Sequence, residues 1–327
     1  MAKLRWGVLG AAKIADAILN GARGSRYNEV VGVAARDSSR AAQWASERGV
    51  PRVFDSYSSL VASDEIDAVY IPLTNNLHME WTVRAAERGK HVLCEKPFAM
   101  NANEVDRMIA AADRHHVKLM EAFMYRFHPQ MPKAKRLVAE GLIGRVKFIR
   151  AAFDYQSKRP PTDLRWHKEL GGGALLDVGS YCVNGALFFA ESPPRAVTGS
   201  GTFTEDDVDE SFAGLIEFQD DVRATFTCSF RAGYNTRLEI QGTTGMLTLL
   251  SPWRTTESPM TIVYSHDERE EVLSAPAVNH YREMLDHFAD CVANDTPVAV
   301  SPQSSRTGMA VIDALFESAR EGRRVTL

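Results

Sequence analysis

The sequence predicts an α/β protein of two domains: a doubly wound parallel sheet, then an α+β domain with a large, mostly antiparallel open sheet. The 327 residues exceed what one hydrophobic core usually holds. Apolar runs first alternate with helix-like segments, which favours a parallel sheet, and then follow one another with period two, which favours an antiparallel sheet. We place the domains at 1–124 and 125–327, with C-terminal helices that can pack back on the first domain.

The first domain alternates strand and helix signals. Apolar, strand-like runs cover residues 4–10, 30–35, 66–73, 91–96 and 119–124, and helices are expected at 12–20, after Asp37 or Ser38, at 79–88 and at 104–114. Asn101 with Glu104 three residues later is typical of a capping box. Gly21 and Gly89 are expected to end the first and third of these helices.

The second domain has consecutive strand signals. They cover residues 146–153, 212–218, 222–230, 238–241 and 246–250, and helices are expected at 173–189, 280–292 and 304–320. The alternation assigns Phe226, Phe230 and Leu238 to the open face of the sheet. Because an apolar open face needs a cover, we expect a homo-oligomer, a dimer or a tetramer.

Composition excludes several classes of function. The chain is 45% hydrophobic and 24% charged with a formal net charge of −4, which is typical of a soluble globular protein and gives no electrostatic footprint for nucleic acid or an anionic membrane. We find no apolar run of membrane-spanning length and no signal peptide. The four cysteines are scattered, which indicates reduced thiols in a cytoplasmic protein. Asp206-Asp207 with Asp209-Glu210 is more typical of a turn than of a metal site, and we predict no metal.

The turn after the first strand is a candidate dinucleotide site. It contains Gly10, Ala11, Ala12, Lys13 and Ile14. The dinucleotide fingerprint has glycine at its second position, where this chain has Ala12. The alternative is an ordinary strand-to-helix turn, but its place on the first strand of an alternating domain favours dinucleotide binding.

The end of the second strand bears on the choice of nucleotide. Arg36, Ser38 and Arg40 form a candidate clamp for a 2′-phosphate, because guanidinium matches phosphate geometry. Asp37 either caps the next helix or serves the ribose hydroxyls of NAD. The sequence therefore favours NADP and leaves NAD open.

Two further segments carry candidate catalytic groups. Lys96 follows a buried strand, between Glu95 and Pro97, at the edge where open α/β sheets bind ligands. Tyr181 lies four residues after Asp177, so both share a face if the segment is an α-helix. A tyrosine with a pKa near 10 suits proton exchange at neutral pH if a cation such as a lysine stabilises its phenolate. The alternative is a tyrosine whose ring is simply part of the core.

These segments together resemble the Gfo/Idh/MocA oxidoreductases, and within them the branch of dimeric dihydrodiol dehydrogenases, NADP-dependent D-xylose dehydrogenases and glucose–fructose oxidoreductase. The resemblance covers essentially the whole chain. It rests on Glu95-Lys96-Pro97, on the glycine turn, on Asp177-x-Gly179-x-Tyr181, and on the stretches that begin at Ala34, Thr74, Met120, Arg126 and Gly171. Two positions depart from the pattern: Ala12 in the glycine turn, and Asn75 where a proline is common.

The resemblance implies a Rossmann domain and roles for several residues. Lys96 would hold substrate and tune the acid, Tyr181 would exchange the proton, and Asp177 would orient the substrate. Residues at the cofactor edge would include Thr74, Asn75, His78, Glu95 and Lys96. For His78 the alternative is a residue at a helix amino terminus. Arg126, Phe127 and Trp166 are candidates to line the substrate pocket, with packing as the alternative for each.

The expected function is an NADP(H)-dependent oxidoreductase that moves a hydride between nicotinamide and a sugar, with an aldose such as D-xylose oxidised at C1 as the favoured reaction. A trans-dihydrodiol or a ketosugar such as 1,5-anhydrofructose is the alternative substrate. A non-catalytic NADP(H)-binding regulator is the alternative of another class. The pair of Lys96 and Tyr181 argues against a regulator, which needs no proton relay.

Overall fold

The computed structural model describes residues 3–253 and 257–327. The chain divides into two compact units. Unit 1 comprises Met1–Met124 and Asn279–Arg306, and unit 2 comprises Tyr125–Val278 and Thr307–Leu327. Residues 280–292 are part of unit 1. The sequence assigned this predicted helix to the second domain, with packing on the first domain as a possibility.

Unit 1 is built on a parallel sheet that, in the described part of the chain, has six strands in the order β3-β2-β1-β4-β5-β6. The strands are β1 (Leu4–Leu9), β2 (Asn28–Ala34), β3 (Arg52–Phe54), β4 (Ala68–Ile71), β5 (His91–Cys94) and β6 (Leu119–Glu121). Fully buried strands such as β4 explain the near-continuous apolar runs of the sequence. The predicted doubly wound sheet is confirmed.

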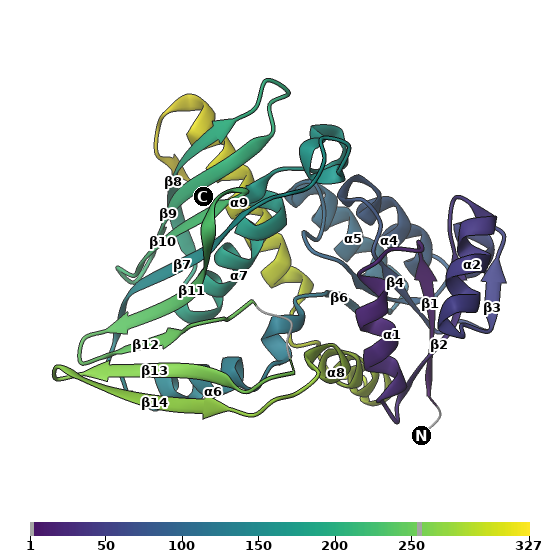
Figure 1. Ribbon diagram of the computed structural model, residues 1–327, viewed down its shortest axis with the longest axis horizontal. Coiled ribbons are helices and arrows are strands. Elements are labelled where there is room, and N and C mark those ends of the chain that lie inside the picture. Colours follow the sequence, from purple (N-terminus) through teal and green to yellow (C-terminus); the bar gives the residue numbers. More distant parts are fainter. Residues whose placement is uncertain (1–2, 254–256) are drawn as a thin grey trace. The chain divides into compact units, whose positions relative to one another are not determined.

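Helices connect these strands (Figure 1). They are α1 (Ala15–Arg23), α2 (Ser38–Arg48), α3 (Tyr57–Val61), α4 (His78–Ala86) and α5 (Ala102–Arg114), with a 3₁₀ turn, η1 (Asn75–Leu77), before α4. The strand β3 and the helix α3 were not predicted, because three and five residues are too few to show a period. Asn101 caps α5 by accepting from the N–H of Glu104, whereas the Glu104 carboxylate accepts from Met100 N.

The prediction that Gly21 ends the first helix is wrong, and packing gives the reason. Helix α1 continues to Arg23, and a Cβ at Gly21 would lie 2.9 Å from the backbone N of Arg282 in α8 (His280–Asn294). In the same unit the Trp6 and Phe288 rings lie 5.3 Å apart. The glycine therefore allows two helices to approach closely, and α8 completes the core of unit 1.

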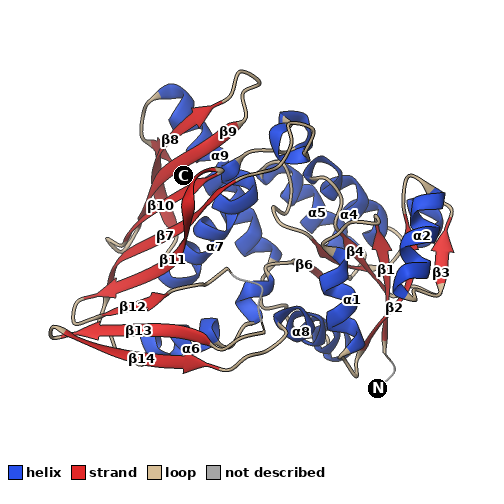
Figure 2. Cartoon of the chain, viewed as in Figure 1, coloured by secondary structure: helices blue, strands red, loops and turns tan. Residues whose placement is uncertain are grey.

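Unit 2 is built on a nine-stranded sheet, within the described residues, of order β14-β13-β12-β11-β7-β10-β9-β8-β15 (Figure 2). Its strands are β7 (Val146–Gln156), β8 (Pro194–Phe203), β9 (Asp209–Phe218), β10 (Arg223–Ser229), β11 (Arg231–Gly242), β12 (Met246–Leu249), β13 (Met260–His266), β14 (Arg269–Ala275) and β15 (Val325–Thr326). All neighbours are antiparallel except β7 and β10. The predicted mostly antiparallel sheet is confirmed.

Helices cover one face of this sheet. They are α6 (Gln130–Ala139), α7 (Ser180–Ala190), a π-helical segment η5 (Leu175–Gly179) before it, and the part of α9 (Pro302–Glu321) that lies in unit 2. The 3₁₀ turns are η2 (Met124–Phe127), η3 (Leu164–Trp166) and η4 (Lys168–Leu170). One helical run, Lys168–Ala190, is long and apolar enough to span a membrane by length and composition, but 83% of its apolar 18-residue window is buried inside the protein, as expected for a core helix.

The assignment of Phe226, Phe230 and Leu238 to the open face is wrong. Their exposed fractions are 4%, 0% and 0%. A Cβ at Gly185 of α7 would contact the Leu238 side chain, so this residue faces the helices. The alternation runs in the opposite register, which leaves small polar residues such as Thr225 and Thr227 exposed on the other face.

Candidate functional site

The cofactor candidates of unit 1 follow the carboxyl ends of adjacent strands. Gly10 follows β1, Thr74 follows β4, and Glu95 and Lys96 follow β5. The strand order reverses between β1 and β4, and open α/β sheets bind ligands at such a switch point. Parallel pairing of β1, β4 and β5 therefore brings these loops to one edge of the sheet.

The glycine turn has the backbone geometry of an anion site. Gly10 has φ of +111°, a conformation that favours glycine, and its N–H donates to Ala34 O at 2.7 Å. Among the described residues, no protein acceptor is recorded for the N–H groups of Ala12, Lys13 and Ile14, which precede α1. Free N–H groups at the start of a helix suit a pyrophosphate, so these residues fit a dinucleotide.

Asp37 is engaged as a helix cap. Its Oδ1 accepts from Ser39 N at 2.9 Å, from Ser39 Oγ at 2.5 Å and from Arg40 N at 3.1 Å. The Ser39 hydroxyl and the Arg40 N–H hold the pKa of the Asp37 carboxyl below its usual range. Arg36, Ser38 and Arg40 are exposed beside this cap.

Arg40 links this segment to the glycine turn. Its Nη2 donates to Ala11 O at 3.1 Å, and the two residues line a hollow of about 280 Å³ together with Lys13 and Arg48. Tyr57 was missed as a neighbour of the site. Its hydroxyl would lie 4.0 Å from a Cβ at Gly10, and α3, which carries it, is too short to be read from sequence.

Buried polar groups hold the backbone around Lys96. Glu95 accepts from the Tyr70 hydroxyl at 2.5 Å and from Lys96 N at 3.3 Å, and the Lys96–Pro97 peptide is cis. Burial, and then the Glu95 carboxylate, raise the pKa of Tyr70 well above its usual value. Tyr70 therefore serves as a neutral donor to Glu95. It was missed because it lies inside an apolar strand, where the pattern indicates core.

His78 is the first residue of α4, and its ring is fully buried. Nδ1 lies 2.9 Å from Pro97 O and Nε2 lies 3.1 Å from Leu73 O. Burial lowers the pKa of His78 to about 4, so the ring is neutral and donates from one nitrogen only. His78 thus ties the loop after β4 to the loop after β5. In the same loop Thr74 Oγ1 donates to Asn76 at 2.7 Å, and Asn75 is 9% exposed.

Glu121 at the end of β6 is a buried acid in the stretch that begins at Met120, but the sequence analysis did not name it as a site residue. Its exposed fraction is 3%, and its strand pairs Cys94 with it in register. Burial raises the pKa of Glu121 to about 8, against the opposing effect of the Phe98 N–H and the Lys96 charge. The carboxyl group is therefore mostly protonated at neutral pH, next to the loop that carries Lys96.

In unit 2, Tyr181 lies in the first turn of α7 with its ring enclosed by other aromatic rings. The ring centroids of Tyr125, Phe153 and Trp253 lie 5.7, 5.4 and 5.9 Å from it, and 7% of the residue is exposed. Aromatic contacts of this kind fix the ring plane and hence the direction of the hydroxyl. Packing and a role for the hydroxyl are therefore compatible.

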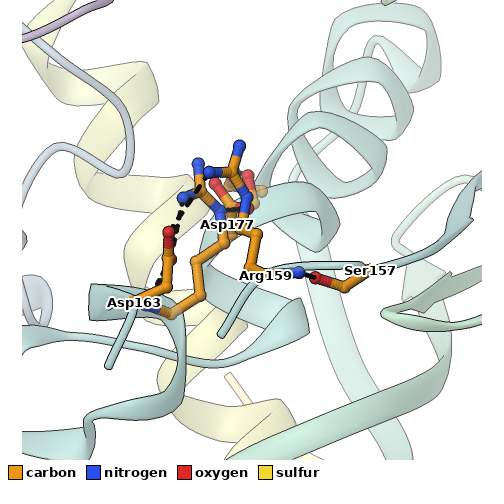
Figure 3. A network of polar contacts seen from close by, with 6 residues as sticks. Ser157, Arg159, Asp163 and Asp177 are labelled. Carbon is orange, nitrogen blue, oxygen red and sulfur yellow. Dashed lines mark hydrogen bonds and ion pairs between the residues drawn. The ribbon is translucent and has the colours of Figure 1, made fainter. Parts of the chain in front are cut away.

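Asp177 lies in the π-helical segment η5, which continues directly into α7, so the predicted helix from 173 to 189 exists but contains a π-helical turn near its start. π-Helical turns are frequent at functional sites. Asp177 Oδ2 accepts from Arg165 Nε at 2.6 Å, and Arg165 Nη1 donates to Asp163 at 3.1 Å. Figure 3 shows this network, to which Arg159 adds a contact with Asp163 at 3.1 Å. Arg165 was missed, because a single arginine in a polar segment has no distinctive spacing.

Of the three further candidates of unit 2, Arg126 and Trp166 make packing contacts. The Arg126 guanidinium lies 3.7 Å from the centroid of the Phe188 ring, and its Nη1 donates to Asn184 at 3.3 Å. Trp166 is half-buried and lies under the Arg231 guanidinium at 4.8 Å, beside a hollow of about 640 Å³. Phe127 is half-buried in η2. Within the described residues, no group of three or more His, Cys, Asp or Glu could hold a metal ion.

Two family profiles match most of the chain. Residues 4–123 match the oxidoreductase family with an NAD-binding Rossmann fold, and residues 131–248 match the GFO/IDH/MocA C-terminal domain. The chain belongs to the Gfo/Idh/MocA family. The predicted resemblance is thereby confirmed, and the chain is an NAD(P)-dependent oxidoreductase with a Rossmann domain for the cofactor.

Individual relatives agree with the Gfo/Idh/MocA assignment. A D-xylose 1-dehydrogenase (NADP(+)) of Haloferax volcanii is 34% identical over 99% of this chain and 100% of its own length. A trans-1,2-dihydrobenzene-1,2-diol dehydrogenase of Xenopus tropicalis is 34% identical over 81% of this chain and 80% of its own. Among solved structures, a 3-ketoreductase from Actinomadura kijaniata in complex with NADP and TDP-benzene has a TM-score of 0.91 at 29% identity, covering 97% of this chain and 98% of that one.

Proposed function

We propose that this chain is an NADP(H)-dependent aldose 1-dehydrogenase that acts on D-xylose or a related sugar. The observation that carries the proposal is the fixed Tyr181 ring at the start of α7, in a chain that retains Lys96 after β5. Likeness to the Haloferax D-xylose dehydrogenase over the full length of both chains supports the substrate class.

The hydrogen bonds of Asp37 and the exposure of its neighbours support the preference for NADP. The Asp37 carboxylate is committed to capping α2, whereas Arg36, Ser38 and Arg40 are exposed at the same strand end. Asp37 Oδ1 already accepts three hydrogen bonds, which leaves only Oδ2 for a ribose hydroxyl. Two guanidinium groups beside a hydroxyl suit a 2′-phosphate.

In the proposed reaction the sugar loses a hydride from C1 and a proton from the hydroxyl group on C1. Bound nicotinamide supplies the hydride acceptor for the hydrogen on C1. Tyr181 takes the hydroxyl proton as a general base, and the Lys96 ammonium lowers the cost of the resulting phenolate. Asp177, held by Arg165, orients the sugar through its remaining lone pairs. Glu95, His78 and Glu121 fix the backbone that carries Lys96 and act as positioning residues.

A second candidate substrate is a trans-dihydrodiol. The Xenopus dihydrodiol dehydrogenase is as similar in sequence as the xylose dehydrogenase, although over less of the chain. The aromatic rings around Tyr181 would also suit a planar apolar substrate. A ketosugar is a third candidate substrate. The alternative to an enzyme is a regulator that binds NADP(H) without catalysing a reaction.

We also propose that the chain forms a homodimer through the open face of the unit 2 sheet. Small residues on β8, β9 and β10, including Thr198, Ser200, Ala213, Thr225 and Thr227, are exposed around a shallow hollow of about 420 Å³. A flat sheet face of small side chains allows two copies to pack closely. Four free, buried cysteines support a reducing, cytoplasmic location.

Absorbance at the NADPH band, followed with a panel of aldoses, dihydrodiols and ketosugars and with both cofactors, tests the proposal. We expect NADP⁺ reduction with D-xylose or a near relative, and a slower rate with NAD⁺. Turnover of dihydrodiols alone would replace the sugar assignment. Tight NADPH binding without turnover of any compound in the panel would favour the regulator.

A further inference from the structure

Asp209 is a buried carboxylate far in sequence from the candidate residues of unit 2, yet it contacts the segment that carries them. It is the first residue of β9, and its exposed fraction is 2%. Its Oδ2 accepts from Leu175 N at 2.6 Å, and the Ala174 N–H also faces the carboxylate. Leu175 begins the π-helical segment that contains Asp177 and leads into α7 with Tyr181.

The backbone of the glycine run 171–173, which precedes this segment, passes close to the Asp209 carboxylate at Gly173. Gly173 has φ of +112°, and a Cβ built on it would collide with Asp209 Oδ1. Thus the third glycine of 171–173 leaves the space that the carboxylate fills.

The contact has the electrostatics of a helix cap supplied from outside the helix. The first N–H groups of a helix have no partner within it, and a carboxylate there gains from both the N–H groups and the helix dipole. Burial raises the pKa of Asp209 to about 7, although the Leu175 and Ala174 N–H groups oppose this. The Arg320 charge of α9 also acts on the Asp209 carboxyl and opposes the rise of its pKa.

We propose that Asp209 is a positioning residue for the reaction: its carboxylate fixes the start of the helical segment that holds Asp177 and Tyr181. This inference rests on the proposed role of Tyr181. A displacement of about 1 Å in a reacting group can cost on the order of 100-fold in rate, so a capping contact that sets the helix start can govern turnover without touching substrate.

The test compares Asp209→Asn with a matched control, Asp207→Asn. Asparagine keeps the size of the side chain but replaces one carboxylate oxygen by an NH₂ group, which accepts no hydrogen bond, and it removes the negative charge that faces the helix start. Asp207 is an exposed acid two residues earlier that pairs with Lys168 and Arg320. We expect kcat to fall roughly 10- to 100-fold in Asp209→Asn with the NADPH dissociation constant unchanged, and no change in Asp207→Asn.

A double variant separates positioning from general damage to the fold. If Asp209 acts through Tyr181, adding Asp209→Asn to Tyr181→Phe lowers the residual turnover no further. The same fold loss in both backgrounds would overturn the inference, as would wild-type kcat in Asp209→Asn. If Asp209→Asn does not fold, Asp209→Ser, which keeps one acceptor in a smaller side chain, takes its place in the same comparison.

The outcomes also separate this inference from the proposed function. Wild-type turnover in Tyr181→Phe alone would overturn the role of Tyr181 and this inference with it. Loss of turnover in Tyr181→Phe together with wild-type turnover in Asp209→Asn would overturn only the positioning role of Asp209.

Discussion

At the residue scale, Asp37 and Arg36 at the end of β2 differ in the hydrogen bonds that they already make within the protein. Oδ1 of Asp37 accepts from the Ser39 N–H, the Ser39 hydroxyl and the Arg40 N–H, while the Arg36 side chain is exposed. Sequence alone predicted these residues at the cofactor edge but could not choose, for Asp37, between a cap and a ribose ligand. The hydrogen bonds favour the cap.

Arg36→Ala should therefore weaken NADP⁺ binding selectively. Loss of a charge-assisted contact with the 2′-phosphate costs about 1.5–3 kcal/mol, so we expect the dissociation constant for NADP⁺ to rise about 10- to 100-fold. Binding of NAD⁺, which lacks this phosphate, should change little. Fluorescence titration with both cofactors measures this, and an equal loss for the two would contradict a phosphate-binding role.

Glu121 gives a prediction about pH. Its pKa in the folded chain is about 8, above the ordinary 4.5, so the unfolded chain loses its proton first as the pH rises. The group therefore lowers the free energy of unfolding progressively between these two values, and by a constant amount above pH 8. Glu121→Gln, which is neutral at every pH, should be more stable than the wild type at pH 8 by about 4 kcal/mol, and nearly equal to it near pH 4.5.

Thermal unfolding at several pH values checks this prediction. Glu87→Gln, a change at an exposed glutamate of unit 1, serves as the control and should show no such trend. A stability difference that is the same at all pH values would contradict the assignment of a protonated Glu121.

At the element scale, the sequence predicted most elements of unit 1 but missed several elements of unit 2. Strands β8, β13 and β14 and helix α6, of seven to ten residues each, were not predicted. Strands such as β7 and helices such as α5 are long enough to show their period, whereas β3 and α3 are not. The π-helical turn before α7 could not be predicted, because its apolar residues suit an α-helix equally well. Asp209 was missed for a related reason: an acid in an acidic run gives no sign that it is buried.

The return of α8 to unit 1 depends on a buried polar chain. Trp6 Nε1 donates to Asn28 Oδ1 at 2.8 Å, and Asn28 Nδ2 donates to Asp286 of α8 at 2.9 Å. Asn28→Ala would leave the buried Trp6 N–H without this partner, and we expect a loss of about 2–4 kcal/mol in the free energy of unfolding. Denaturant unfolding measures the loss. Asn294→Ala, at an exposed residue of α8, should cost under about 0.5 kcal/mol, and equal losses would contradict the account.

At the scale of the whole molecule, the sequence predicted the two kinds of sheet but placed the wrong residues on the open face. A shift of one residue in the alternation moves every side chain to the other face, and β10 carries threonines and apolar residues in turn. The open face of the unit 2 sheet carries small polar side chains, and we expect a second copy of the chain to cover this face.

Light scattering after size exclusion tests that expectation. The wild type should elute as a dimer, and Thr225→Arg, which adds a long charged side chain to the centre of the face, should shift it toward the monomer. Ser46→Arg, on an exposed position of α2 in unit 1, is the matched control and should stay dimeric. A dimer that survives Thr225→Arg unchanged would contradict the proposed interface.

The most direct measurement of the central claim compares Tyr181→Phe with the wild type. The substitution keeps the ring among Tyr125, Phe153 and Trp253 and removes only the hydroxyl, so the fold and the cofactor site should be unaffected. Because general acid–base catalysis typically contributes 10²- to 10⁴-fold, we expect kcat for sugar oxidation to fall by about that factor while the NADPH dissociation constant stays the same. Turnover near that of the wild type would contradict the assignment of Tyr181 as the proton-exchanging group.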